Sequence, residues 1–404
     1  MLVLLAWRNI WRNKTRSLVI ISSVALGLFA GLLVLSIFKG MMKGRIQTLV
    51  HQEVGHLQIH HKDFKKDLDP LFTIEHMDRW LKELHKNKWV KNFATRTITT
   101  AMLSTTTGSA GVQINGIIAS QEISVSALDK KIIEGMVFHP NKNNEILIGR
   151  KLAKKMKLKL GHKLVLTLTD TASNLIAGAF RVAGIYQSEN SVFDERNVYI
   201  KKEMLNEMLG IGAANHEISI ILFNNDSCDL AKEQFKKIDT LALVETWKDI
   251  SPETEMMNNT IDIYAVVLMM IILFALSFGI VNTMLMAILE RTAEIGMMTA
   301  LGMNKFRLFW MVLFETSILT LAGTPLGIGV SWFLIKHYER VGIDWSRMGK
   351  EMMSSFGFPT KIYPVFPTEN FWTIVSIVLI TAILSCIYPA IKALQLRPAD
   401  ALRK

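Results

Sequence analysis

Four long apolar runs constrain the fold of this chain more than any other feature of its sequence. A bilayer core about 30 Å thick requires roughly 20 apolar residues in a helix, and each run reaches that length. The runs cover residues 18–38, 261–289, 308–335 and 371–391. We therefore expect an α-helical membrane domain of four transmembrane helices.

The composition also requires a large part outside the membrane. Hydrophobic residues make up 50% of the chain, yet 20% of the residues are charged, more than membrane helices can hold. Residues 53–255 between the first two runs are long enough to bury a core of their own. This segment alternates strand-like runs (Val54–His60, Val112–Ile118, Glu145–Ile148, Lys163–Thr169, Ala179–Tyr186, His216–Leu222) with amphipathic helical runs (Arg150–Leu158, Lys201–Leu209, Asp226–Ile238). We predict a mixed α/β extracytoplasmic domain inserted between helices 1 and 2.

The first apolar run is predicted to be an anchor rather than a cleaved signal. It is longer than a typical signal-peptide core, and no small-x-small cleavage site follows Phe38. Met41, Ile46 and Leu49 keep a helical spacing after it. The helix should therefore continue as a stalk to about residue 52.

The distribution of charge predicts the orientation. Residues 1–17, the segment from Glu290 to Arg307 and the tail 392–404 carry net charges of +4, +1 and +3 out of a total of +11. Because Lys and Arg near a span favour the cytoplasmic side, both termini and the loop 290–303 should be cytoplasmic. Residues 336–370 then form an external loop. Its aromatic residues suit the membrane interface, where the loop could either simply rest or control the entry of a substrate from the side of the bilayer. No excess charge remains to argue for nucleic acid.

Catalytic and metal-binding patterns are weak. His51, His56, His60 and His61 lack an obvious completing ligand, so we interpret them as polar residues at a strand edge and predict no metal site. Asp194 and its neighbours resemble a solvated loop. The chain has no P-loop and no G-x-S-x-G elbow, so it does not look like an enzyme.

Glu315 is an unusual residue because it lies within an apolar run. An acid inside a membrane is either functional or a structural carboxylate bonded to another helix, and the sequence leaves both open. Gly323 and Gly327 follow in the same run. They permit close helix packing or a kink.

The segment 290–303 is predicted to be a short amphipathic helix. Ile295, Met298 and Leu301 share one helical face, Gly302 is a plausible C-cap and Asn304 a plausible N-cap of the next helix. Such a helix could lie on lipid or dock a soluble partner. Its acids argue against simple adhesion to anionic lipid.

These motifs resemble the permease subunits of ABC transporters of the MacB, FtsX and LolC/LolE type. The matching stretches are Val281-Asn282-Thr283, Glu290-Arg291-Thr292-x-Glu294-Ile295-Gly296, Ala300-Leu301-Gly302, Glu315 with Gly323 and Gly327, and Tyr388-Pro389-Ala390 leading to Arg397-Pro398-Ala399-x-Ala401-Leu402. The order of one span, a large external domain and three further spans also matches, and the layout is most similar to the LolC/LolE group.

The resemblance implies partners and a mechanism. The permease would pair with a second copy or a paralogue in the bacterial inner membrane, and a cytosolic ABC ATPase dimer would bind ATP and Mg²⁺, leaving no cofactor in this chain. The implied ATPase-coupling residues are Glu290, Arg291, Glu294, Ile295, Gly296, Met298, Leu301 and Gly302. The tail residues Arg397, Pro398 and Leu402 are implied cytoplasmic contacts, and Asn282, Glu315, Gly323 and Gly327 are candidates within the membrane.

Three functions remain open at this point. The first is extraction of a lipoprotein or another amphiphile from membrane lipid, with a periplasmic chaperone. The second is FtsX-like signalling to a partner such as a cell-wall hydrolase, and the third is peptide or drug export with a periplasmic adaptor. For the mechanism that they share, we predict that Glu294→Lys or a charge at Ile295 uncouples ATP hydrolysis without unfolding the external domain.

Overall fold

The structure is a computed structural model that describes residue 12 and residues 14–394. The predicted contact residues Arg397, Pro398 and Leu402 lie outside the described residues. The chain divides into two compact units. The first, here called the membrane unit, comprises Met1–Met41, Asn259–Ile343 and Ile362–Lys404. The second, here called the α/β unit, comprises Met42–Asn258 and Asp344–Lys361.

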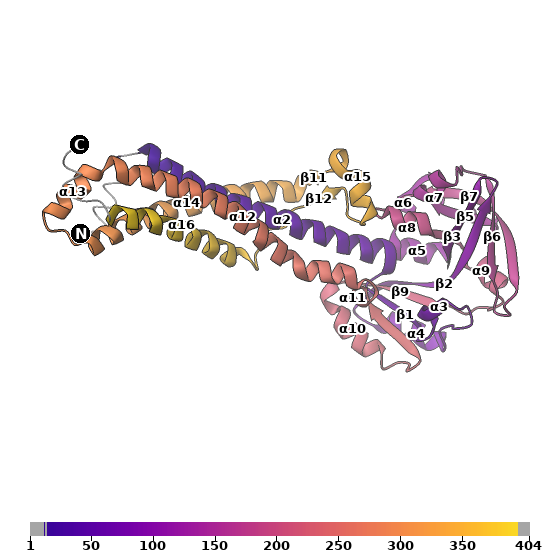
Figure 1. Ribbon diagram of the computed structural model, residues 1–404. Helices are drawn as coiled ribbons and strands as arrows, with labels where there is room; N and C mark the ends of the chain where they lie inside the picture. Colours follow the sequence, from indigo (N-terminus) through magenta and orange to yellow (C-terminus); the bar gives the residue numbers. More distant parts are fainter. Residues whose placement is uncertain (1–11, 13, 395–404) are drawn as a thin grey trace. The chain divides into compact units, whose positions relative to one another are not determined.

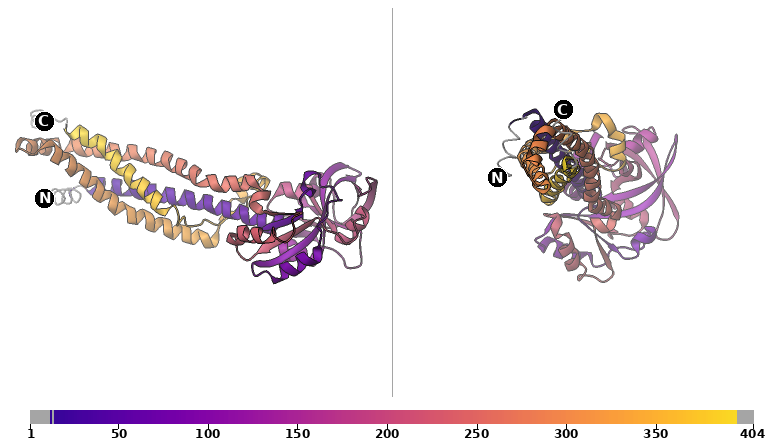
Figure 2. Two further views of the ribbon diagram at one scale, coloured as in Figure 1. Left: turned by 90° about the horizontal axis from the view of Figure 1, so that it is seen from below. Right: turned by 60° about the vertical axis from the view of Figure 1, so that its left-hand side comes forward.

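Four long helices, which lie side by side in Figures 1 and 2, account for the four apolar runs. They are α2 (Lys14–Thr48), α12 (Pro252–Glu290), α14 (Lys305–Val341) and α16 (Phe371–Leu394). Each is long and apolar enough to cross a membrane, as predicted. A π-helical turn, η1 (Leu49–Val54), continues α2, so the helix extends to about where the stalk was expected to end.

Glycines allow the membrane helices to approach closely. A Cβ on Gly323 would lie 2.8 Å from the Ile21 carbonyl oxygen, and one on Gly327 would lie 2.8 Å from the Ala25 carbonyl oxygen. Such distances are too short for any larger residue, so the two glycines bring α14 against the backbone of α2. Of the two roles that the sequence left open for them, the structure shows close packing.

The α/β unit is built on a ten-stranded sheet. Its strands are β1 (Leu57–His61), β2 (Val90–Thr105), β3 (Gly108–Ile117), β4 (Ile132–Gly135), β5 (Glu145–Gly149), β6 (Lys163–Thr169), β7 (Leu175–Tyr186), β8 (Asn197–Lys201), β9 (Glu217–Leu222) and β10 (Ala242–Thr246). The order is β10-β1-β9-β2-β3-β8-β5-β7-β4, and β6 pairs with both β2 and β7. The strands β2, β3, β8, β5, β7 and β6 therefore close into a ring, filled by apolar side chains such as Ile114, Leu166 and Phe180.

Short helices cover the rest of this unit. They are α3 (Phe64–Asp67), α4 (Met77–Lys86), α5 (Ala119–Ser126), α6 (Leu128–Lys131), α7 (Arg150–Lys155), α8 (Ser191–Arg196), α9 (Lys202–Leu209), the 3₁₀ turn η2 (Asn225–Ser227), α10 (Cys228–Phe235) and α11 (Trp247–Ile250). A second core, around Trp80, Phe235 and Trp247, packs beside β1, β9 and β10.

The predicted external loop 336–370 is more structured than expected. Helix α14 continues into it as far as Val341, and α15 (Ser346–Ser355) forms a separate helix that belongs to the α/β unit. Two short strands, β11 (Ile343–Asp344) and β12 (Lys361–Ile362), pair with each other. The sequence interpretation took this segment as a loop because it joins two apolar runs.

Candidate functional site

Helix α13 (Thr292–Ala300) joins α12 to α14. At its end Gly302 adopts φ +91°, and the Met303 amide donates to the Met298 carbonyl oxygen at 3.0 Å. This is the Schellman pattern that glycine favours. The Asn304 side chain then accepts from the Phe306 amide at 3.1 Å and caps α14. Both predicted caps are therefore present.

The side chains of this helix point in two directions. Ile295 is only 5% exposed and packs in the core of the membrane unit, with Met298 against it. Gly296 is also buried. In contrast, Met297 is 54% exposed and Leu301 is 83% exposed. Of the three residues predicted to share one helical face, Ile295 and Met298 hold the helix in place, and Leu301 projects outward.

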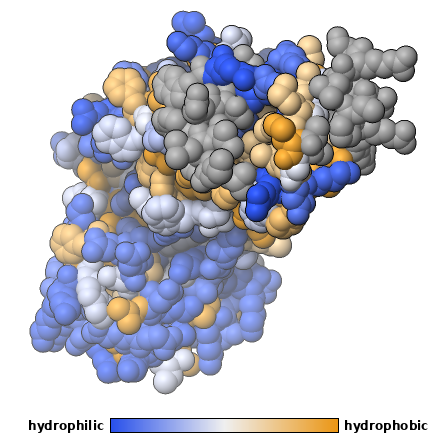
Figure 3. All heavy atoms as spheres, turned by 90° about the vertical axis from the view of Figure 1, so that its left-hand side faces the viewer, coloured by the Kyte–Doolittle hydropathy of each residue, from blue (hydrophilic) through white to orange (hydrophobic). Residues whose placement is uncertain are grey.

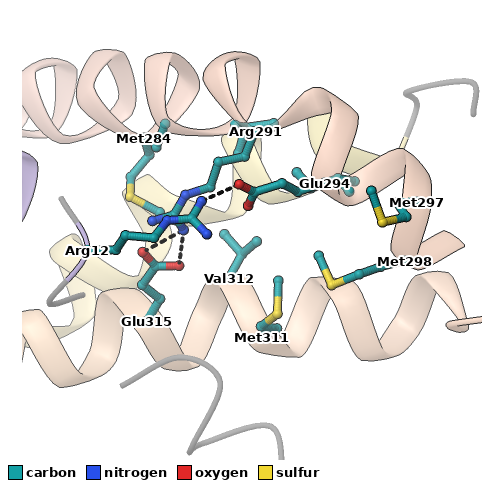
Figure 4. A pocket seen from close by; sticks show the side chains of 12 residues that line it. Arg12, Met284, Arg291, Glu294, Met297, Met298, Met311, Val312 and Glu315 are labelled. Atoms are coloured by element: carbon teal, nitrogen blue, oxygen red, sulfur yellow. Dashed lines mark hydrogen bonds and ion pairs between the residues drawn. The ribbon is translucent and has the colours of Figure 1, made fainter. Parts of the chain in front are cut away.

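Three ion pairs connect α13 and the end of α12 to other parts of the membrane unit. Arg12 pairs with Glu294 (Figure 4). Arg16 on α2 pairs with Glu290. The Arg291 guanidinium donates to the Glu315 carboxylate on α14 at 3.3 Å. The pairs therefore tie both α2 and α14 to the segment that joins α12 to α14.

Glu315 therefore has a charged partner within the membrane unit. The Glu315 side chain is 9% exposed and that of Arg291 is 11% exposed. A buried carboxylate requires such a partner. The sequence left open whether Glu315 is a functional acid or a structural carboxylate bonded to another helix. The Arg291–Glu315 pair is a contact of the kind that the structural interpretation expects.

A pocket of about 250 Å³ opens beside these pairs (Figure 4). Met284, Met298 and Met311 line it together with the Arg291–Glu315 pair. Flexible thioethers can repack when neighbouring helices shift. In the view from the end that carries α13, hydrophilic and hydrophobic residues lie intermixed beside the grey atoms (Figure 3).

Asn282 lies close to this cluster. It lines a neighbouring pocket with Arg12, Arg16 and Glu290 and is exposed there. Gly323 and Gly327 serve the contact between α14 and α2 instead. The structure therefore brings most of the predicted residues together and leaves these two glycines in a packing role.

The sequence interpretation missed Arg12 and Arg16 as members of this site. Both were assigned to membrane topology, as part of the basic segment before the first run. Their positions are 282 and 274 residues from their acidic partners. One signal in the sequence could have indicated these ion pairs. Arg12 and Arg16 lie four residues apart, and so do Glu290 and Glu294. This spacing would place the two residues of each set on one face of a helix.

Two interpretations within the α/β unit are wrong. His60 is not at a sheet edge, because β1 lies between β10 and β9 and this side chain is buried. His56, the residue before β1, is buried as well. Burial lowers the pKa of His56 to about 4 and that of His60 to about 3. Among the residues that the structure describes, no three His, Cys, Asp or Glu side chains converge on a metal-sized site.

Asp194 does not lie in a solvated loop. It is 2% exposed within α8, and it accepts hydrogen bonds from the Ser188 hydroxyl at 2.6 Å and the Ser188 amide at 3.0 Å. Burial raises the pKa of Asp194 to about 6. The pattern of adjacent charges suggested exposure, but the helix directs Asp194 inward and leaves Glu195 to pair with Lys155.

A buried charge cluster in the same unit has a structural role. Arg96 on β2 donates to Glu122 at 2.8 Å and to Glu217 at 2.7 Å. Burial opposes the charge of Arg96, but the attraction of the two carboxylates outweighs it and raises the pKa of Arg96. The cluster joins α5, β2 and β9, and it is completely enclosed.

Comparison with known proteins agrees with this architecture. Residues 17–238 match the MacB-like periplasmic core domain, and residues 266–398 match the FtsX-like permease C-terminal model. The lipoprotein-releasing system transmembrane protein LolC of Xylella fastidiosa (strain 9a5c) is 23% identical over 305 residues, 72% of each chain. An uncharacterized ABC transporter permease of Methanocaldococcus jannaschii is 22% identical over 431 residues, covering 100% of this chain and 97% of that one.

Among solved structures, the periplasmic region of MacB from Actinobacillus actinomycetemcomitans aligns with a TM-score of 0.36 and 13% identity, over 52% of this chain and 95% of that one. The two family models together account for both the inserted α/β unit and the helices that follow it. This chain belongs to the ABC-transporter permeases of the MacB, FtsX and LolC/LolE family.

Proposed function

We propose that this permease couples ATP hydrolysis by a separate cytosolic ATPase to movement of its α/β unit, and that the ATPase docks on α13. One observation supports this most strongly: Leu301, directly after α13, is exposed, while Ile295 and the Arg12–Glu294 pair fix that helix to the bundle. An exposed apolar side chain on a helix that is firmly attached to the spans suits a contact that must transmit force.

The ion pairs supply a route for that force. Displacement of the end of α12 acts on α2 through Glu290 and Arg16 and on α14 through Arg291 and Glu315. Displacement of α13 acts on Arg12 through Glu294. Because α2 and η1 are helical from Lys14 to Val54, a movement at one end of α2 is carried along its length. ATP and Mg²⁺ would be held by the partner, and a second permease copy or paralogue would complete the transporter.

We further propose that the cargo is a lipoprotein or another amphiphile taken from the inner membrane. The LolC relative, whose name assigns it to a lipoprotein-releasing system, covers 72% of this chain and supports this choice. Purification of the complex in native lipid, followed by mass spectrometry of bound molecules, tests it. An acylated protein among them supports the proposal, whereas a bound hydrolase activator or an adaptor with no acylated ligand would favour signalling or export.

The docking proposal is tested by one substitution beside α13 and one control substitution in the α/β unit. Leu301→Asp should reduce recovery of the ATPase with the permease about tenfold, because a charge replaces an apolar contact. Met352→Asp, at a residue that is 70% exposed in the α/β unit, should leave recovery unchanged. Equal recovery in all three proteins would overturn the docking site.

Glu294→Lys tests transmission rather than docking. The substitution places a cation opposite Arg12, so the ATPase should still bind while ATP hydrolysis no longer responds to cargo. A charge at Ile295 is less informative than the sequence suggested, because this side chain is buried in the bundle and a charge there disturbs packing directly. Normal cargo-stimulated hydrolysis in Glu294→Lys would contradict the proposed route.

A further inference from the structure

A basic pocket lies entirely within the α/β unit and takes no part in the coupling described above. Its volume is about 700 Å³, within the range of small-ligand sites. Residues of η1, α6, α7, α8 and α15, which come from separate parts of the sequence, line it. Six cationic side chains line it: Lys130, Lys131, Arg150, Lys151, Lys154 and Lys350.

These cations are poorly compensated. Only three acids, Glu189, Asp194 and Glu351, line the same pocket, and Asp194 accepts its hydrogen bonds from Ser188. The structure gives Lys130, Lys151, Lys154 and Lys350 no ion-pair partner among the described residues. Like charges that converge on one cavity repel each other, and a bound anion would relieve that repulsion.

Two buried polar groups in the pocket also lack full compensation. Burial lowers the pKa of Lys131 to about 8, although its ammonium group donates to the Gln52 carbonyl oxygen at 3.1 Å. The Ser191 hydroxyl is buried and has no hydrogen-bond partner in the described part of the chain. An anion would stabilise the charged form of Lys131, and one of its oxygens, directly or through a water, could accept from Ser191.

We propose that this pocket binds a phosphate-bearing anion. Phosphate oxygens suit several convergent ammonium groups and the Arg150 guanidinium. The ligand would contact both η1, which continues α2, and α15. It would thereby hold these two elements of the α/β unit together. The source of the phosphate is either a small soluble anion or a phospholipid headgroup, and the experiment below separates them.

Binding should be measured by calorimetry on the full chain in phosphatidylcholine nanodiscs, with inorganic phosphate and with short-chain phosphatidylglycerol as probes. The wild-type chain should bind at least one probe saturably at low salt. The double variant Lys151→Gln/Lys154→Gln should weaken that binding about tenfold, because two cations on α7 are lost. Saturable binding of phosphate indicates a soluble anion, and binding of phosphatidylglycerol alone indicates a headgroup.

A matched control is the double variant Lys82→Gln/Lys86→Gln on α4, which removes two exposed lysines that do not line the pocket. It should bind within twofold of wild type. Lys350→Gln on α15 should weaken binding independently of α7. Absence of saturable binding of either probe to wild type, or equal loss in the α4 control, would overturn the proposal. The test does not depend on ATPase docking, because no residue of α13 lines this pocket.

Discussion

At the scale of single residues, charged side chains at the α13 end of the membrane unit join helices that are far apart in sequence. Arg291 and Glu315 are both largely buried and lie 3.3 Å apart. Removing Arg291 takes away the guanidinium that donates to the buried Glu315 carboxylate, which is a larger penalty than losing an exposed pair. The pair should therefore contribute to the stability of the bundle as a unit.

A double-mutant cycle with Arg291→Gln and Glu315→Gln tests this cooperation. We expect a coupling energy of about 1–3 kcal/mol in denaturation of the full chain in nanodiscs. The cycle for Lys336 and Glu339, an exposed pair 3.1 Å apart on α14, serves as the control. Its coupling should stay below about 0.5 kcal/mol. Equal coupling in the two cycles would mean that burial adds nothing to the Arg291–Glu315 pair.

Asp194 predicts a pH dependence of a definite sign. Burial raises its pKa to about 6, whereas an unfolded aspartate titrates near 4. Between these values the folded state binds more protons than the unfolded state, so this group adds stability as the pH falls from about 6 to about 4. Above pH 6 the ionised carboxylate imposes its full burial penalty.

The variant Asp194→Asn removes this contribution. On acidification from pH 7 to pH 4, the stability of wild type should rise relative to this variant by about 2 kcal/mol. The unfolding midpoint of the full chain at each pH measures the change. The buried histidines contribute equally to the pH dependence of both proteins, so their contribution is absent from the difference between the two. Asp226→Asn, at an exposed position, should track wild type. A constant gap between wild type and Asp194→Asn would contradict the assigned burial.

At the scale of elements, close packing depends on small residues at fixed places. Gly327 and Gly329 lie on the same helix, yet a Cβ on Gly327 would meet the Ala25 carbonyl oxygen at 2.8 Å, whereas a Cβ on Gly329 would meet nothing within 4 Å. The contact between α14 and α2 should therefore tolerate a larger residue at Gly329 and not at Gly327.

Valine at each glycine separates packing from helix propensity. Gly327→Val should force α14 away from α2 and destabilise the membrane unit by about 1–3 kcal/mol. Gly329→Val introduces the same β-branched residue without the clash and should lie close to wild type. Thermal unfolding in nanodiscs compares them, and similar midpoints for the two variants would refute the close contact.

Elements with a clear apolar period were predictable, and those stabilised by partners distant in sequence were not. The alternation in Lys163–Thr169 predicted β6 with its observed bounds. Strand β2 was missed because Thr95, Arg96, Thr97 and Thr99 are buried polar residues. Their burial depends on partners such as Glu122 and Glu217, which only the folded sheet brings to Arg96. The same reason hid the roles of Arg12 and Arg16.

At the scale of the whole molecule, the four helices and the sign of the flanking charges predict the topology. Both native cysteines, Cys228 and Cys386, are buried, so introduced cysteines can be labelled selectively. Leu175 is 79% exposed in the α/β unit and Leu301 is 83% exposed beside α13.

In intact spheroplasts, a membrane-impermeant maleimide should label Leu175→Cys, and Leu301→Cys should react only after the membrane is opened. Parallel labelling of detergent-solubilised protein controls for reactivity. Labelling of both positions in intact spheroplasts would contradict the predicted orientation. Labelling of Leu301→Cys alone would indicate the opposite orientation.

The central claim is that a cytosolic ATPase docks where Leu301 projects from the end of α13. A photo-crosslinking amino acid at Leu301, expressed in native membranes, tests it most directly. Leu326, which is 57% exposed on α14, supplies the matched control. The account predicts an ultraviolet-dependent crosslink from position 301 to a P-loop ATPase and none from position 326. If position 301 crosslinks no ATPase in cells where the intact permease supports ATP-driven transport, the docking role of α13 is contradicted.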